Sequence, residues 1–141
     1  MRRYYEFFLV VIIISLLSLF LMNRLNAVRD EIEAATVQAD AASMRLQLLE
    51  VIAHRETFGG LVPVSDNPVD WLASPLQAYQ GVLDDAPAAH SVWYFDRRQK
   101  VLIYRFRDGH AARFRLNRHI GQSENRGVLA GVSLQRLDDQ P

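Results

Sequence analysis

The chain of 141 residues contains no cysteine. It therefore cannot form a disulfide, a thiolate metal site or a cysteine nucleophile. The sequence also has no Gly-x-Ser-x-Gly turn that would expose a serine nucleophile, and no glycine-rich phosphate loop. Its histidines are scattered along the chain, and we expect them to be ordinary surface residues: His54, His90, His110 and His119. We expect a protein that is not an enzyme and holds no cofactor or metal, since a secreted enzyme would need a cleft that the sequence does not indicate.

Glycine and proline are absent from residues 4–58, although the whole chain has seven glycines and five prolines. Both residues disfavour a helix interior. We therefore expect one long helix through this region, and Gly59-Gly60 followed by Pro63 predicts its end.

Charged side chains are absent from the segment Phe7 to Met22, in which Ser15 and Ser18 are the only polar residues. With the two preceding tyrosines the segment approaches the roughly 20 residues that a helix needs to cross the hydrocarbon core of a bilayer. Residues 1–24 are therefore predicted to be a transmembrane anchor. The alternative is a cleaved secretory signal, but Leu25-Asn26-Ala27 is a poor cleavage site and the helical pattern continues beyond it.

Basic residues lie mainly on one side of this segment. Arg2 and Arg3 precede it and only Arg24 follows closely, while Tyr4 and Tyr5 are placed where the lipid headgroups would lie. The positive-inside rule then places the N-terminus in the cytoplasm and residues 25–141 across the membrane. In a bacterium this means a single-pass inner-membrane protein with a periplasmic C-terminal domain.

Beyond the anchor, residues 25–58 continue the helix with apolar residues in alternating steps of three and four. This is the 3.5-residue repeat of a coiled coil. Its positions are Leu25, Val28, Ile32, Ala35, Ala39, Ala42, Leu46, Leu49 and Ala53. We expect residues 25–43 to meet another chain or to stand free. For residues 44–56, packing on the chain's own domain is an equal alternative, because Leu48, Val51 and Ile52 widen the apolar stripe.

The remaining chain is long enough for one small domain. Residues 59–90 are rich in turn-forming residues and are predicted to be a connecting loop with one helical turn near Val69–Leu72. Residues 91–141 are predicted to be an antiparallel sheet with strands at 91–95, 100–107, 111–116 and 128–137, the last interrupted by glycine. Asp108-Gly109 predicts a two-residue hairpin turn. Alternation along the strands predicts one buried face and one face in water.

These elements predict an α+β fold, in which a long N-terminal helix, membrane-embedded in its first half, packs on a small antiparallel meander. Basic residues are scarce before this meander, since residues 25–96 hold eleven acidic and three basic side chains. Residues 97–126 hold nine basic and two acidic side chains. Such a cluster can bind nucleic acid, but no aromatic residues interleave it in a stacking pattern. We expect a solvated face that pairs with the acidic half, and no nucleic-acid binding at physiological salt.

The pattern of a hydrophobic N-terminal helix with a glutamate near its start, a loop and a meander resembles the type IV pilins and pseudopilins. The segments Asn67–Leu72, Tyr79–Gly81, Trp93–Asp96 and Val101–Arg105 are similar to the globular part of minor-pilin-like proteins of mannose-sensitive haemagglutinin (MSHA) pilus biogenesis. The head positions that carry this resemblance are Pro68, Trp71, Gly81, Trp93, Tyr94, Asp96 and Tyr104.

The resemblance implies a role for Glu6. In this family a glutamate at the fifth mature position meets the amino terminus of a neighbouring subunit in the filament, and Glu6 would be fifth if only Met1 were removed. The peptidase of the family requires Gly or Ala before an aromatic residue at the start of the apolar segment, which this sequence does not offer there, so a non-cleaved subunit that stays in the inner membrane is an equal expectation. From the residues alone, Glu6 can also be an interfacial carboxylate that balances Arg2 and Arg3.

The resemblance thus implies a structural or accessory subunit in the biogenesis of a type IV (MSHA-like) pilus or related secretion machine, acting through helix–helix and head–head contacts. The expected partners are the membrane, other pilin-like or pilus-assembly subunits, and a second copy of the chain. Two alternatives are a bitopic inner-membrane coiled-coil scaffold that never enters a filament, and an extracytoplasmic DNA-binding minor pilin.

Overall fold

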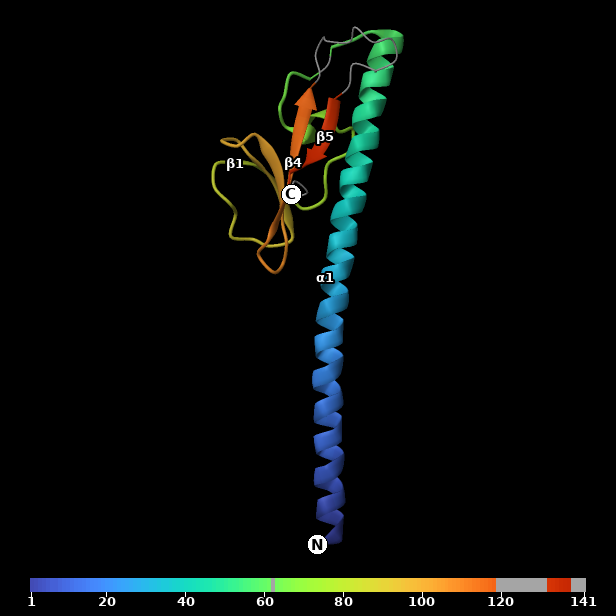
Figure 1. Ribbon diagram of the computed structural model, residues 1–141, viewed down its shortest axis with the longest axis vertical. Coiled ribbons are helices and arrows are strands. Elements are labelled where there is room, and N and C mark those ends of the chain that lie inside the picture. Colours follow the sequence, from blue (N-terminus) through green and yellow to red (C-terminus); the bar gives the residue numbers. More distant parts are fainter. Residues whose placement is uncertain (62, 119–131, 138–141) are drawn as a thin grey trace. The chain divides into compact units, whose positions relative to one another are not determined.

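The computed structural model of the protein describes residues 1–61, 63–118 and 132–137. The chain divides into two compact units, Met1–Ala35 and Thr36–Pro141. The predicted α+β class, with a long N-terminal helix packed on a small sheet, is confirmed. The elements are helix α1 (Arg2–Phe58), the 3₁₀ helix η1 (Pro68–Trp71), and strands β1 (Tyr79–Leu83), β2 (Val92–Asp96), β3 (Val101–Arg105), β4 (Ala111–Arg118) and β5 (Val132–Arg136) (Figure 1).

The first unit is the N-terminal part of α1. Its large apolar side chains between Phe7 and Met22 are all exposed, from 42% at Val11 to 70% at Phe20. The hydroxyl of Ser15 donates to the Val11 carbonyl at 2.7 Å, so this polar group is satisfied within the helix. By length and composition the helix can cross a membrane, which is compatible with a single-pass membrane protein.

Helix α1 ends where the sequence predicts. Gly59 takes a positive φ of 71°, and its N–H donates to the Arg55 carbonyl at 2.8 Å. This is the left-handed C-cap that glycine permits at low cost. The cap turns the chain into the connector that leads to η1.

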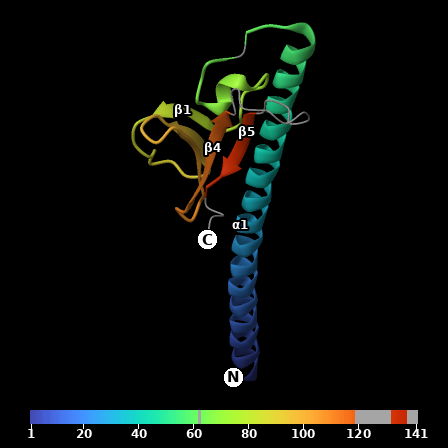
Figure 2. The same cartoon turned by 45° about the horizontal axis from the view of Figure 1, so that its top comes forward.

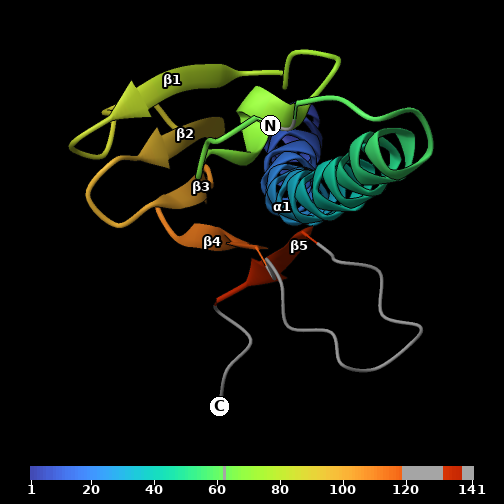
Figure 3. The ribbon, with the colours of Figure 1, turned by 90° about the horizontal axis from the view of Figure 1, so that it is seen from above.

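The sheet belongs to the second unit, and its strands lie in the order β1-β2-β3-β4-β5 (Figure 3). Strands β2 to β5 pair antiparallel, as predicted. Strand β1 was not predicted: it lies within the segment 59–90 and pairs parallel to β2, so the sheet is mixed rather than a pure antiparallel meander. Its five residues include Gly81 and are flanked by turn formers, which conceal a strand pattern. The predicted helical turn is present as η1.

The remaining strand predictions hold with shifted ends, and residues 128–131 of the predicted last strand lie outside the described residues. The β3–β4 turn is one residue longer than the predicted two-residue hairpin. The Phe106 N–H donates to the His110 carbonyl at 2.9 Å, and the Gly109 N–H donates to the Phe106 carbonyl at 3.0 Å. Gly109 has φ of 95°, so the turn is a three-residue loop that closes on a glycine with positive φ.

The main core lies between α1 and one face of the sheet. Trp93 is at its centre, with its ring 5.0 Å from that of Tyr104 and 5.6 Å from that of Phe114. The residues of α1 that are buried there are Val37, Ala41, Met44 and Leu48, and Ile52 is buried farther along the same helix. Packing on the chain's own domain is thus confirmed for residues 44–56. The prediction for residues 25–43 is wrong at its C-terminal end, because Val37 and Ala41 already pack on the sheet.

The opposite sheet face is only partly in water, contrary to the prediction. Tyr94, Val101 and Ile103 are buried there, with Leu83, Ala111 and Leu137 packed against them. Strands β2 and β3 are therefore buried on both faces, as their unbroken apolar runs allow. On β4 the prediction holds, since Arg113 and Arg115 are exposed.

Candidate assembly surfaces

Helix α1 carries a second apolar stripe that its own sheet leaves uncovered. Leu46 is 69% exposed and Leu49 is 50% exposed. At about 100° per residue, these positions lie away from the buried positions Met44 and Leu48. Within the second unit we call this surface the outer stripe, and it consists of Ala39, Ala42, Leu46, Leu49 and Ala53, all of which are exposed.

The other predicted subunit-contact residues lie in the first unit and are also exposed. They are Leu25, Val28, Ile32 and Ala35. The coiled-coil repeat and the sheet-packing stripe are thus two different sets of positions on one helix. Sequence spacing identified the coiled-coil repeat, but of the positions buried on α1 it named only Leu48 and Ile52 and missed Val37, Ala41 and Met44.

Two hydrogen bonds fix the helix on the sheet. The Trp93 Nε1–H donates to Asp40 Oδ2 at 3.2 Å, from β2 to α1. The Arg45 Nε–H donates to the Leu134 carbonyl at 3.1 Å, from α1 to β5. Both contacts flank the buried stripe, so they hold the outer stripe on the side of the helix that faces away from the sheet.

The Arg45 bond closes one edge of the sheet. The Leu137 N–H donates to the Arg113 carbonyl, and the register then places the Leu134 carbonyl on the free side of β5. β5 lies beside α1 (Figures 2 and 3). This edge carbonyl is thus satisfied by a helix side chain, so it is not available to pair with another strand.

At the N-terminal end, Glu6 pairs with its own helix. Its Oε1 lies 3.7 Å from the Arg2 Nε, four residues before it. The Glu6 side chain is 69% exposed and that of Arg2 is 96% exposed. Tyr4 and Tyr5 are exposed beside them, and so is Arg3. The pair agrees with the interfacial interpretation of Glu6, and its exposure leaves the carboxylate accessible to a second cation.

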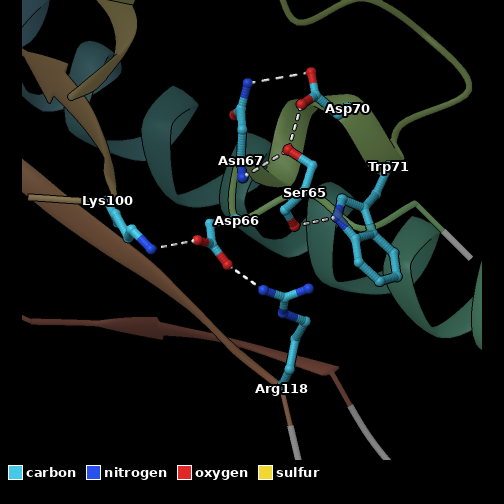
Figure 4. A network of polar contacts seen from close by, with 7 residues as sticks. All are labelled: Ser65, Asp66, Asn67, Asp70, Trp71, Lys100 and Arg118. Carbon is cyan, nitrogen blue, oxygen red and sulfur yellow. Dashed lines mark hydrogen bonds and ion pairs between the residues drawn. The ribbon is translucent and has the colours of Figure 1, made fainter. Parts of the chain in front are cut away.

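The first half of the head motif builds the connector. Asn67 is 3% exposed and caps η1, because its Oδ1 accepts from the Val69 N–H at 3.1 Å. Its amide donates to the Tyr79 hydroxyl at 3.0 Å. The Trp71 Nε1–H donates to the Ser65 carbonyl at 3.0 Å (Figure 4). Together with the buried ring of Pro68, these contacts pin the connector to the core.

Asp66 connects the connector to two ends of the sheet. Its Oδ2 lies 3.0 Å from the Lys100 Nζ, and its Oδ1 accepts from the Arg118 guanidinium (Figure 4). The hydrogen bond from Lys100 and the positive charges of Lys100 and Arg118 outweigh the opposing desolvation and hold the pKa of Asp66 below its usual 3.8. The carboxylate is therefore charged at neutral pH.

The second half of the motif forms the sheet. Trp93 and Tyr104 lie in the main core, while Tyr94 is buried on the other face, where burial and then the charge of Asp96 raise its pKa. The carboxylate of Asp96 accepts from the backbone N–H groups of Arg98 and Gln99 and so forms the β2–β3 turn. Gly81 has φ of 97° at the irregular β1–β2 register. The seven motif residues therefore build the head and do not line one shared surface.

The basic cluster is largely paired. Arg97 and Arg98 each approach an acidic residue of the β1–β2 connection at 3.9 Å, namely Asp84 and Asp85. The Arg105 guanidinium donates to the Pro87 carbonyl. With Lys100 and Arg118 on Asp66, these contacts agree with the expected pairing to the acidic half of the chain. Arg126 and His119 lie outside the described residues.

A groove between α1 and the connector was not predicted from the sequence. Its larger part has a volume of about 660 Å³ and is lined by Gln47, His54, Gly60 and Ser74 among others. A smaller part of about 250 Å³ continues it toward Asp40. The buried Oε1 of Gln47 has no hydrogen-bond partner in the described structure. Only the return of the chain at Gly59-Gly60 could have indicated that such a groove would form.

Among the described residues, no group of three or more His, Asp and Glu side chains could hold a metal ion. No protein-family model, curated protein or solved structure matches the chain.

Proposed function

We propose that this chain is a single-pass protein of the bacterial inner membrane. In this proposal it acts as a structural or accessory subunit in the biogenesis of a type IV (MSHA-like) pilus or a related secretion machine. The observation that carries the proposal is that one continuous helix, Arg2–Phe58, has exposed apolar surface in both units although its C-terminal part already packs on a sheet. Lipid would cover the first surface, and other subunits would cover the second.

In this proposal the head is periplasmic, because Arg2 and Arg3 would retain the N-terminus in the cytoplasm. The role is mechanical and not enzymatic: the outer stripe makes helix–helix contacts and the sheet makes head–head contacts. The paired basic residues of the head support protein contacts over nucleic-acid binding, since each cation that already faces a carboxylate contributes less to phosphate binding.

A second candidate function has one observation in its favour. The Arg2–Glu6 pair gives the carboxylate a partner within its own helix, so a neighbouring amino terminus is not needed to neutralise it. This favours a bitopic scaffold that remains in the inner membrane and never enters a filament. Both functions use the outer stripe, and they differ in where the mature protein is found.

The test is a gene deletion in the bacterium that encodes the chain, with surface pili scored by electron microscopy. We expect pili to be lost and to return with the full chain, and we expect the protein to remain in alkali-washed membranes because Phe7–Met22 spans the bilayer. Protein in sheared pili would identify a filament subunit, and protein only in membranes would identify the scaffold. Normal piliation of the deletion strain would overturn the proposal.

A further inference from the structure

We propose that the outer stripe of α1 is covered by a second copy of this chain, so that two copies form a parallel helix pair. The pair is formed through Ala39, Ala42, Leu46, Leu49 and Ala53. This inference rests on the proposed membrane anchoring, and it deepens the proposed function by naming the partner of the helix.

The outer stripe leaves leucine side chains exposed on a helix that already packs on the sheet. The sheet buries Met44 to 1% exposure and Leu48 to 1%, whereas Leu46 and Leu49, which alternate with them along the helix, are 69% and 50% exposed. A helix that packs on one sheet needs one apolar stripe. A second, uncharged stripe with solvent-exposed leucines indicates another packing partner.

The residues of the outer stripe have the sequence spacing of a coiled coil. The outer stripe advances in steps of three, four, three and four residues, which is the knobs-into-holes repeat of two supercoiled helices. In this repeat Ala39, Leu46 and Ala53 occupy one core position of each heptad, and Ala42 and Leu49 occupy the other. The alanines allow the backbones to approach closely, and the leucines supply the buried apolar area.

Membrane anchoring sets the relative direction of the two helices. Two copies that enter the membrane the same way have parallel helices at equal depth, so the stripe of one copy meets the same stripe of the other. Such an interface is symmetric and closed, and it produces a dimer rather than a chain of subunits. The sheet does not obstruct it, because the sheet packs on the buried stripe.

The charged residues beside the outer stripe are complementary in a parallel pair. Arg45 and Glu50 are both exposed beside the outer stripe, at flanking positions five residues apart. In a parallel pair these are the positions that face each other across the interface, so each Arg45 meets the Glu50 of the other copy. An antiparallel pair would instead place like charges opposite. Because Arg45 Nε donates to the Leu134 carbonyl at 3.1 Å, the pairing with Glu50 would use the terminal nitrogens of the guanidinium.

The same rule limits how far the pair extends. Arg24 and Arg29 have the spacing of Arg45 and Glu50 but carry the same sign, so they would repel each other across a parallel pair. We therefore confine the contact to residues 39–53. Three of its five stripe residues are alanine, so the buried area is small and the pair is weak in dilute solution. Confinement in a membrane raises the effective concentration and allows the pair to form.

The absence of cysteine in the chain permits a direct test by crosslinking. Single-cysteine variants of the full chain, Ala42→Cys, Leu46→Cys and Leu49→Cys, are produced in a host without pilus genes and oxidised in membranes. We expect dimer-sized crosslinks at these three positions. The matched controls His54→Cys and Arg55→Cys, which are exposed and lie off both the stripe and its flanking positions, should crosslink little.

A charge exchange adds an independent readout to the Leu49→Cys background. Glu50→Arg should lower the crosslinking yield by a factor of about three or more, and combining it with Arg45→Glu should restore the yield. Equal crosslinking at stripe and control positions would overturn the proposal. Crosslinking that requires other pilus subunits would also overturn it, because the partner would then be a different protein. Neither result contradicts the proposed function, because that function is tested separately by the piliation of the deletion strain.

Discussion

At the residue scale, Asp66 shows how one carboxylate can hold a connector in place. It accepts from Lys100, before β3, and from Arg118, at the end of β4. Both cations lie far from Asp66 in the sequence, so the contact joins three separate segments (Figure 4). The lowered pKa of Asp66 means that the folded state binds its proton less tightly than the unfolded state does.

This pKa predicts an acid-sensitive contribution to stability. The contribution is present above the unfolded pKa near 3.8 and is lost as the pH falls through the lower folded pKa. Because the Asp66 side chain is 36% exposed, solvent screens the pair, and Asp66→Asn should cost only about 0.5–1 kcal/mol at neutral pH. Thermal unfolding of the full chain in detergent, at neutral pH and well below the pKa, measures the difference.

The control for this prediction is Asp85→Asn, since Asp85 is 89% exposed and meets Arg98 only at 3.9 Å. We expect no measurable change from it at either pH. An equal loss for both variants at neutral pH, or a loss for Asp66→Asn that persists in acid, would contradict the assignment of this stability to the Asp66 contacts.

Single residues also show what sequence could and could not predict. Trp93, Trp71 and Pro68 belong to the family-like motif, and the structure places all three in buried sites that build the head. The role of Asn67 was not predicted beyond a turn. Its cap on η1 is local and could be read from spacing, but its bond to Tyr79 depends on where β1 lies, which spacing does not give.

At the element scale, α1 carries two apolar stripes with different roles. Met44 belongs to the buried stripe and is 1% exposed, whereas Leu46 belongs to the outer stripe. Met44→Ala should therefore destabilise the head by about 2–5 kcal/mol through a core cavity. Leu46→Ala should change head stability by less than about 0.5 kcal/mol. Near-ultraviolet circular dichroism during urea unfolding of the full chain in detergent compares them, and similar losses would show that the stripes are not separate.

The long helix, the three strands β2 to β4 and the positions of the turns between them were predictable because each has a strong local pattern. β1 was not, since its pairing with β2 is parallel and depends on a connection through residues 84–91. The burial of Tyr94 and Ile103 was missed for a related reason. Alternation reports which side chains share a face, and it does not report that other segments of the chain cover the second face.

At the scale of the whole molecule, charge and apolar surface are distributed unevenly along one chain. The acidic residues before residue 97 and the basic residues after it meet in the head, as in the pairs Arg97–Asp84 and Lys100–Asp66. The acidic and basic parts of the sequence thus form ion pairs with each other within the head. The segment Phe7–Met22 and the outer stripe of α1 are not buried inside the fold, and in the proposed function lipid covers the first and protein covers the second.

Glu6 provides the test that separates the two proposed roles of the chain. If its carboxylate meets the amino terminus of a neighbouring subunit, Glu6→Leu should abolish surface pili. Membrane insertion should remain, because removing a charge beside an apolar segment makes insertion easier. The matched control is Arg2→Gln, which removes the Arg2–Glu6 pair but keeps the carboxylate, and it should leave piliation intact.

Complementation of the deletion strain, scoring surface pili and protein level together, measures both variants. Glu6→Gln tests the charge itself, because it keeps some hydrogen bonding but cannot neutralise an amino terminus, and we expect it to assemble poorly. If Glu6 only balances Arg2 in its own helix, all three substitutions are silent. Normal piliation with Glu6→Leu at a normal protein level would therefore assign Glu6 to the membrane interface and favour the scaffold over the filament subunit.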